Sequence, residues 1–171
     1  MELKLQRCVI EDLEKLVTIS KATFIDAFEK DNNPADFESY INEAFSSERL
    51  RSELENKNTR FYFVFSGHEL IGYLKLNKGP AQSDIKDDQS LELERIYVIQ
   101  QFQGKGIGNW LLQQVIQIAR NEASNYVWLG VWQKNQAAVR FYLRHGFQKF
   151  DTHPYYIGKD KQTDWLMRLN L

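Results

Sequence analysis

Three glycines in the middle of the chain have the residue type and spacing of a site that binds an anion. Gly104, Gly106 and Gly108 follow a strand-like segment, 91–98, whose apolar alternation breaks once near Arg95 and so predicts a β-bulge. An amphipathic helix is predicted directly after them from Leu111, Leu112, Val115, Ile116 and Ala119. The first turn of such a helix presents unpaired N–H groups and the positive end of the helix dipole. The turn therefore predicts a phosphate-binding site.

Two well-known phosphate loops do not fit this spacing. The dinucleotide pattern G-x-G-x-x-G would need its third glycine one residue after Gly108, and the P-loop pattern would need serine or threonine after Lys105. What remains is Gln103-x-x-Gly106-x-Gly108. It resembles the acetyl-CoA signature of the GCN5-related N-acetyltransferase (GNAT) superfamily, whose general form is Gln/Arg-x-x-Gly-x-Gly/Ala.

A second segment, 127–147, reads as a buried strand, a short turn and a helix, and it resembles the other acetyl-CoA motif of that superfamily. The motif is Asn-x-x-Ala-x-x-x-Tyr-x-x-x-Gly-Phe, and it falls on Asn135, Ala138, Tyr142, Gly146 and Phe147. Each residue also has a structural explanation: Asn135 as a helix N-cap, Gly146 as the end of the helix, and Tyr142 as part of the core. Two motifs in the right order favour the functional interpretation.

The resemblance implies a role for each matching residue in binding acetyl-CoA as cosubstrate. The pantetheine arm would pair with the backbone of Ile96, Tyr97 and Val98, and Asn135 would bind it as well. The diphosphate would be held at the glycine turn by Gln103, Gly104, Lys105, Gly106, Ile107, Gly108 and Asn109. The nucleotide phosphate would be reached by Arg144, or alternatively by Lys134 or Arg140. No metal is expected.

The chemistry implied by the resemblance is acetyl transfer to an amine, which needs a base and an acid. A primary amine with a pKa near 10 is mostly protonated at neutral pH, so a base must take its proton while an acid assists the leaving thiolate. We expect Tyr142 to be the acid. Glu94 and Glu92 are the candidate bases, with Glu94 preferred because it is nearer to the pantetheine segment. Direct attack is expected, because no cysteine or serine is found where a covalent intermediate would require it.

The charges of the chain are divided between its two halves. Residues 1–94 carry 19 acidic and 12 basic side chains, whereas residues 95–171 carry 4 and 10. The half with both motifs is therefore positive, as suits a ligand with several phosphates. The acidic side chains Asp84, Asp87, Asp88, Glu92 and Glu94 face only Lys86 in the segment 84–94. This run is either a solvated loop and strand or a rim that attracts a cationic amine.

Length and composition fit one domain, 1–171, with a single good-sized core, since 43% of the 171 residues are hydrophobic. The one cysteine, Cys8, excludes an intramolecular disulfide and is expected to be buried. No apolar run of membrane length and no leader pattern is found, so we expect a cytoplasmic protein that does not bind a membrane. The dispersed basic residues argue against nucleic-acid binding.

The elements that must position these residues follow from periodicity and turn signals. Strands are predicted at 3–9, 61–65, 70–76, 91–98, 126–132, 148–157 and 163–169, and helices at 12–28, 34–45, 46–55, 107–119 and 135–145. This order is similar to that of the GNAT fold. The resemblance implies an α/β (α+β) protein with a mixed, mostly antiparallel seven-stranded sheet flanked by helices. Its fourth and fifth strands would splay apart.

The whole sequence is most similar to bacterial spermidine/spermine N-acetyltransferases of the PaiA type, a similarity that includes Gln162-Thr163-Asp164. The leading hypothesis is therefore acetyl-CoA-dependent acetylation of a small primary amine, with a polyamine such as spermidine or spermine first. Two alternatives stay open: acetylation of a protein N-terminus or lysine, which needs an open groove, and a non-catalytic module that binds acetyl-CoA. The chain is expected to be a monomer or a homodimer.

Overall fold

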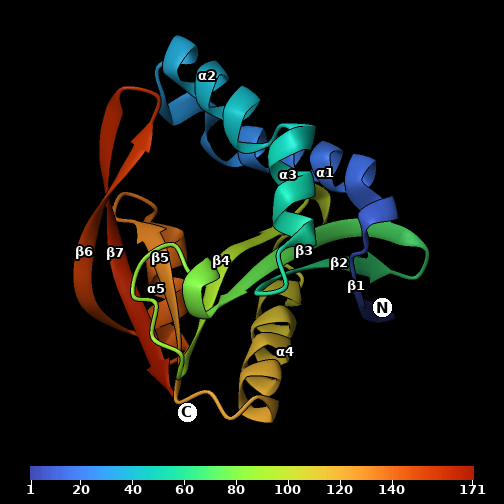
Figure 1. Cartoon of the computed structure of the whole chain (residues 1–171), viewed down its shortest axis with the longest axis vertical. Coiled ribbons are helices and arrows are strands. Elements are labelled where there is room, and N and C mark those ends of the chain that lie inside the picture. Colours follow the sequence, from blue (N-terminus) through green and yellow to red (C-terminus); the bar gives the residue numbers. More distant parts are fainter.

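The computed structural model describes residues 1–171, which form one seven-stranded sheet with helices on both faces (Figure 1). The strands are β1 (Leu3–Arg7), β2 (Thr59–Ser66), β3 (Glu69–Lys78), β4 (Ser90–Val98), β5 (Tyr126–Trp132), β6 (Gln148–Ile157) and β7 (Asp160–Asn170). Their order in the sheet is β1-β2-β3-β4-β5-β7-β6, and only the β4–β5 pair is parallel. The predicted mixed, mostly antiparallel sheet is confirmed.

The helices are α1 (Leu13–Phe28), α2 (Pro34–Ala44), α3 (Ser47–Glu55), α4 (Ile107–Asn121) and α5 (Gln136–Arg144). Asn33 and Ser46 cap α2 and α3, because their side-chain oxygens accept backbone N–H groups of the first turn. The main differences from the predicted elements are at the ends: β1 ends at Arg7, and β7 begins at Asp160. None of the helices is long and apolar enough to cross a membrane.

The two faces of the sheet bury separate apolar clusters. One cluster lies under α4 and α5 and includes Leu111, Val115 and Phe147; the other lies under α1–α3 and includes Phe24 and Phe45. Figure 1 shows α1–α3 on one side of β2–β4 and α4 on the other. Because both faces are covered, the central strands are buried along most of their length, and Cys8 is buried as predicted.

Strands β4 and β5 separate soon after they meet, as the resemblance implied. They pair only from Ser90 to Glu92 on β4, opposite Tyr126 to Trp128 on β5. The rest of β4 therefore has no strand partner on the β5 side. Apart from the Val98 carbonyl, which accepts from the Gln103 side chain, its backbone groups there are free for a ligand. The predicted bulge is confirmed as well: Lys75 pairs with Arg95 and Leu76 with Leu93, so Glu94 has no partner on β3.

Candidate active site

The glycine turn before α4 presents six unpaired amides. Gly104 and Gly106 have φ of 74° and 80°, and a Cβ built on either would meet no atom within 4 Å. The backbone N–H groups of residues 104–109 make no hydrogen bond within the protein. Gln103 differs, since its amide donates to the Gln100 carbonyl and its side chain donates to the Val98 carbonyl at 2.9 Å. The turn therefore fits a diphosphate, and Gln103 fixes the turn to the end of β4.

A groove of about 970 Å³ runs from this turn along the open side of β4. Of the residues predicted to bind the cofactor, all but Lys105 and Tyr142 line it, namely Ile96, Tyr97, Val98, Gln103, Gly104, Gly106, Ile107, Gly108, Asn109, Asn135 and Arg144. Tyr142, which the resemblance places near the thiol sulfur of the cosubstrate, lines the neighbouring cavity. Lys105 lies over the Phe102 ring, at 5.0 Å from its centroid. The alternatives to Arg144 for the nucleotide phosphate, Lys134 and Arg140, do not line the groove.

The groove opens into a second cavity through the gap between β4 and β5. Phe28, Ile96, Tyr97 and Asn135 line both spaces, and the Phe28 ring lies 6.4 Å from Tyr97 and 6.3 Å from Trp132. Asn135 also caps α5, since its Oδ1 accepts the Ala138 amide at 3.3 Å. Asn135 can therefore cap the helix and also bind the pantetheine arm, because its side-chain NH₂ makes no hydrogen bond within the protein.

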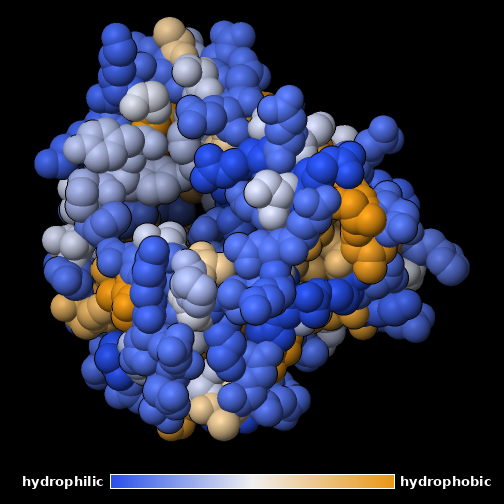
Figure 2. Space-filling view, in the orientation of Figure 1, coloured by the Kyte–Doolittle hydropathy of each residue, from blue (hydrophilic) through white to orange (hydrophobic).

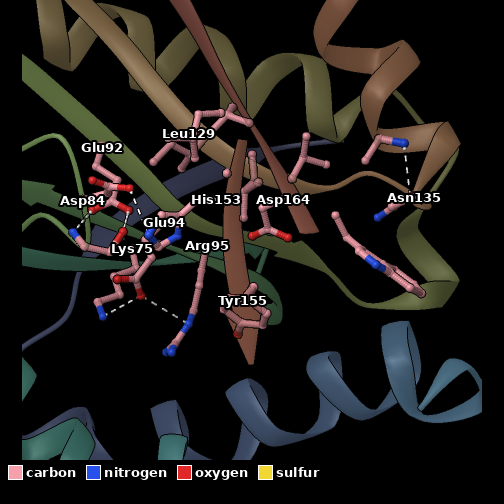
Figure 3. A pocket seen from close by; sticks show the side chains of 18 of the residues that line it. Lys75, Asp84, Glu92, Glu94, Arg95, Leu129, Asn135, His153, Tyr155 and Asp164 are labelled. Carbon is pink, nitrogen blue, oxygen red and sulfur yellow. Dashed lines mark hydrogen bonds and ion pairs between the residues drawn. The ribbon is translucent and has the colours of Figure 1, made fainter. Parts of the chain in front are cut away.

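The second cavity has a volume of about 370 Å³ and combines aromatic with charged side chains. Figure 3 shows Asp84, Glu92 and Glu94 at one end, Asn135 at the other, and Asp164 between them. In Figure 2 the surface is hollowed below the part of the molecule that holds α2, and the hollow is surrounded mostly by hydrophilic residues.

Both candidate bases face this cavity, since residues two apart on a strand lie on the same face. Glu92 is 2% exposed, and it accepts the Ser83 amide at 2.8 Å, the Asn77 side-chain amide at 3.0 Å and the Ser83 hydroxyl. Burial, followed by the nearby charge of Glu94, raises the pKa of Glu92 above its ordinary value. A carboxylate with a raised pKa holds a proton more strongly, which favours Glu92 as a base near neutral pH.

Glu94 has the opposite electrostatic environment. Its Oε2 lies 2.7 Å from the Lys75 ammonium and 3.5 Å from Arg95 Nε, and its Oε1 accepts from the Asn77 amide at 3.0 Å. Burial alone would raise the pKa of Glu94, but the Lys75 and Arg95 charges outweigh it and hold the pKa below the ordinary value. The geometry therefore favours Glu92 over the glutamate that the sequence preferred.

Tyr142 lies in the cavity wall on α5. Its ring packs against Phe141 and Phe147, as expected if Tyr142 is part of the core. The residue also lines the cavity. The hydroxyl makes no hydrogen bond within the protein, and burial raises its pKa. A tyrosine that stays protonated and has a free O–H can donate to an atom that enters the cavity.

The acidic run 84–88 divides into two groups. Asp84 lines the cavity and lies 3.2 Å from His153 Nε2. Asp87 has a structural role, since it accepts the Tyr126 hydroxyl and the Gln89 amide, each at 2.8 Å, and Asp88 does not line the cavity. The proposed cation-attracting rim is therefore limited to Asp84 within this run.

The β6–β7 hairpin meets α2 and the residues before it above the cavity (Figure 1). The hydroxyls of Tyr40 and Tyr155 contact each other, Gln162 Nε2 donates to Asn32 Oδ1 at 2.5 Å, and the Lys159 amide donates to Asp36 at 3.2 Å. These contacts join the N-terminal helices to the C-terminal hairpin. The cavity is consequently bridged on the side of these contacts.

Several side chains of this site carried no signal in the sequence. Ser83 hydrogen-bonds Glu92 inside the cavity, although no serine was expected there. His145 lines the groove, with its Nε2 at 2.8 Å from Asn109 Oδ1 and its Nδ1 at 2.8 Å from the Phe141 carbonyl. Asp164 was noted only as part of a resemblance. Each depends on contacts between distant segments, so local spacing could not identify it.

Comparison with known proteins decides the family. The model of the acetyltransferase (GNAT) family matches residues 21–147. The chain belongs to this family. An uncharacterized N-acetyltransferase of Lactobacillus delbrueckii subsp. lactis is 36% identical over 92% of this chain and 91% of that protein. A spermidine N(1)-acetyltransferase of Thermoplasma acidophilum is 26% identical over 89% and 92%.

The fold comparison agrees. The crystal structure of PaiA N-acetyltransferase from Thermoplasma acidophilum in complex with coenzyme A aligns over 100% of both chains, with a TM-score of 0.80 and 24% identity. The GNAT fold is thus shown, and this GNAT protein is an N-acetyltransferase that uses acetyl-CoA as cosubstrate. The free amides of residues 104–109 and the unpaired edge of β4 are the features of this chain that fit the cosubstrate.

Proposed function

We propose that this GNAT enzyme acetylates the primary amine of a small cationic molecule, with a polyamine such as spermidine or spermine as the leading acceptor. The observation that carries the proposal is the cavity of about 370 Å³ at the gap between β4 and β5, where Glu92 and Asp164 have no cationic partner within 4.0 Å. A protein segment would need an open groove, whereas the contact between Tyr40 and Tyr155 bridges two walls of this cavity. The spermidine acetyltransferase relative supports the same class of acceptor.

The charges of the cavity support a cationic acceptor once internal pairs are counted. Lys75 Nζ lies 2.7 Å from both Glu53 and Glu94, Arg49 Nε lies 3.1 Å from Glu53, and Arg95 Nε lies 3.5 Å from Glu94, so these three cations offset the charges of both glutamates. Glu92 and Asp164 have no cationic partner within 4.0 Å. Two carboxylates without an internal cation attract an ammonium group more strongly in an enclosed cavity than on an open surface.

The reaction follows from this arrangement. The cosubstrate supplies an acetyl thioester at the gap between the strands. Glu92 accepts one proton from the acceptor ammonium, and the amine nitrogen then bonds to the acetyl carbon. As the carbon–sulfur bond breaks, the nitrogen loses a second proton and the leaving sulfur gains one to become the thiol, while Tyr142 donates a hydrogen bond or proton to that sulfur. The backbone of Ile96–Val98 and Asn135 position the thioester arm.

Direct attack is part of the proposal. The cavity contains no cysteine, and its one serine, Ser83, donates its hydroxyl to Glu92. Acetyl-CoA alone should therefore leave the mass of the protein unchanged, and Ser83→Ala should retain turnover. A stable increase of one acetyl group that disappears in Ser83→Ala would contradict direct attack.

The roles of Tyr142 and the glutamates are tested by steady-state kinetics. We expect Tyr142→Phe to lower kcat by roughly 10²–10³ with little change in acetyl-CoA affinity, because only the hydroxyl is lost. Glu92→Gln should remove the acidic limb of the pH profile of kcat/KM, whereas Glu94→Gln should leave that limb in place. Loss of the limb in Glu94→Gln alone would show that Glu94 is the base.

A further inference from the structure

One carboxylate in the cavity is used by neither the fold nor the reaction described above. Asp164 on β7 makes no hydrogen bond or ion pair within the protein, although it is largely buried and lines the cavity. Its register partner on β6 is His153, which itself pairs with Asp84. Asp84, Glu92 and Glu94 lie at one end of the cavity, and Asp164 lies between them and Asn135 (Figure 3).

The local structure leaves room for this carboxylate. Asp164 lies opposite Trp132 on β5, and its Oδ2 would be 3.3 Å from a Cβ built on Gly130. The absence of a side chain at Gly130 lets the carboxylate extend over β5 into the cavity. Burial raises the pKa of Asp164 to about 6, so the group is ionised above that pH despite the energetic cost of burial.

Glu92 on β4 is the other carboxylate without an internal cation. Its position relative to Asp164 on β7 can be followed along β5, the strand between them. Glu92 pairs with Trp128 on β5, two residues from Gly130. Two residues of a strand span about 7 Å, and one to two strand spacings of about 5 Å separate the carboxylates across the sheet. The two groups are therefore on the order of 10 Å apart, on opposite sides of one enclosed space.

We propose that Asp164 binds a second cationic nitrogen of the acceptor while Glu92 serves the nitrogen that reacts, so that the enzyme selects amines with two cationic centres joined by a short alkyl chain. This inference rests on the proposed function, because it assigns the acceptor class of the same cavity. The apolar wall between the two carboxylates, which includes Leu129 and Tyr155, contacts the methylene chain. Asp164 is a positioning and specificity residue that takes no part in proton transfer.

The test compares a diamine with the monoamine of the same chain length. With 1,4-diaminobutane and spermidine as acceptors, Asp164→Asn should raise KM by about 10–100-fold, the range of a hydrogen bond to a charged group, with kcat nearly unchanged. The KM for butylamine should change little. Asp164→Glu should recover part of the diamine preference, and Asp151→Asn, which removes an exposed carboxylate of the same hairpin, should leave all values as in the wild type.

Three results would overturn the inference. An unchanged KM for diamines would show that Asp164 does not contact the acceptor. Equal effects on diamines and butylamine would place Asp164 near the reacting nitrogen only. A fall in kcat with loss of the acidic limb would make Asp164 the base in place of Glu92.

Failure of the proposed function gives a different pattern. If the wild type turned over no amine, calorimetric titration of spermidine into the protein with bound coenzyme A would still test Asp164. Spermidine binding that weakens in Asp164→Asn would support the inference, and binding that is equal in both proteins or absent from the wild type would refute it.

Discussion

Removing the charge of Asp164 is expected to stabilise the protein while weakening its function. The folded-state pKa of about 6, against 3.8 for the free side chain, means that the folded protein disfavours the ionised form. At 1.36 kcal/mol per pH unit, the difference corresponds to ~3 kcal/mol as an upper bound. The Asp164→Asn variant lacks this cost but still buries an amide, so a gain of about 1–3 kcal/mol is expected at pH 8.

The pH dependence of this gain follows from proton linkage. Well below pH 3.8 Asp164 is protonated in both the folded and the unfolded wild type, and the cost is absent. As the pH rises from about 4 to 6, the unfolded state loses the proton first and the wild type loses stability relative to the variant. Above pH 6 the difference is constant.

Urea unfolding of both proteins from pH 4.5 to 8 measures this difference directly. The free energy of unfolding of Asp164→Asn should exceed that of the wild type at pH 8, with a thermal midpoint higher by roughly 2–4 °C per kcal/mol, and the two should converge toward pH 4.5. Asp151→Asn is the control, since it removes an exposed carboxylate of the same hairpin. A variant that is less stable than the wild type at pH 8 would show that Asp164 has a stabilising partner and would refute the reasoning.

Three further predictions concern the walls of the two spaces. Acetyl-CoA should raise the thermal midpoint of the wild type much more than that of Gly106→Val, because a side chain at Gly106 occupies the space of the phosphate. The control Gly67→Ala changes a glycine with the same left-handed backbone far from the groove and should be protected like the wild type. Equal protection of Gly106→Val would contradict the assignment of the glycine turn. Gly130→Ala should raise the KM for spermidine several-fold by crowding the Asp164 carboxylate, and an unchanged KM would contradict that contact. Asp84→Asn should raise the KM for spermidine modestly and reduce the salt dependence of that KM, whereas Asp87→Asn should do neither. Identical behaviour of the two variants would contradict the assignment of Asp84 to the cavity and of Asp87 to a structural role.

Most of the fold could be predicted because its signals are local. Each of four local signals specifies an element within a few residues: Pro34 at the start of α2, Ser46 before α3, the hairpin glycine Gly67, and the apolar run 126–132. The bulge near Arg95 was visible as a break in alternation. The ends of β1 and β7 were less accurate, because their last pairs depend on the partner strand more than on their own residues.

The glycine turn could be predicted from local sequence, whereas the arrangement of the acidic side chains in the cavity could not. The cofactor turn is continuous in sequence, so its glycines and the following helix could be identified together. The choice between the glutamates could not be made, because it depends on Lys75, which reaches Glu94 only through the β3–β4 register. Asp164 is even more remote, since it joins the cavity through the β5–β7 pairing.

Competition between two acceptors tests the central claim most directly. The wild-type enzyme is incubated with acetyl-CoA and equal concentrations of spermidine and a lysine-containing peptide, and the products are followed by mass spectrometry together with thiol release. Our account predicts acetylspermidine as the main product, formed in proportion to the thiol released, with little acetylated peptide. Acetylation of the peptide in preference to spermidine, or thiol release without acetylated amine, would contradict it.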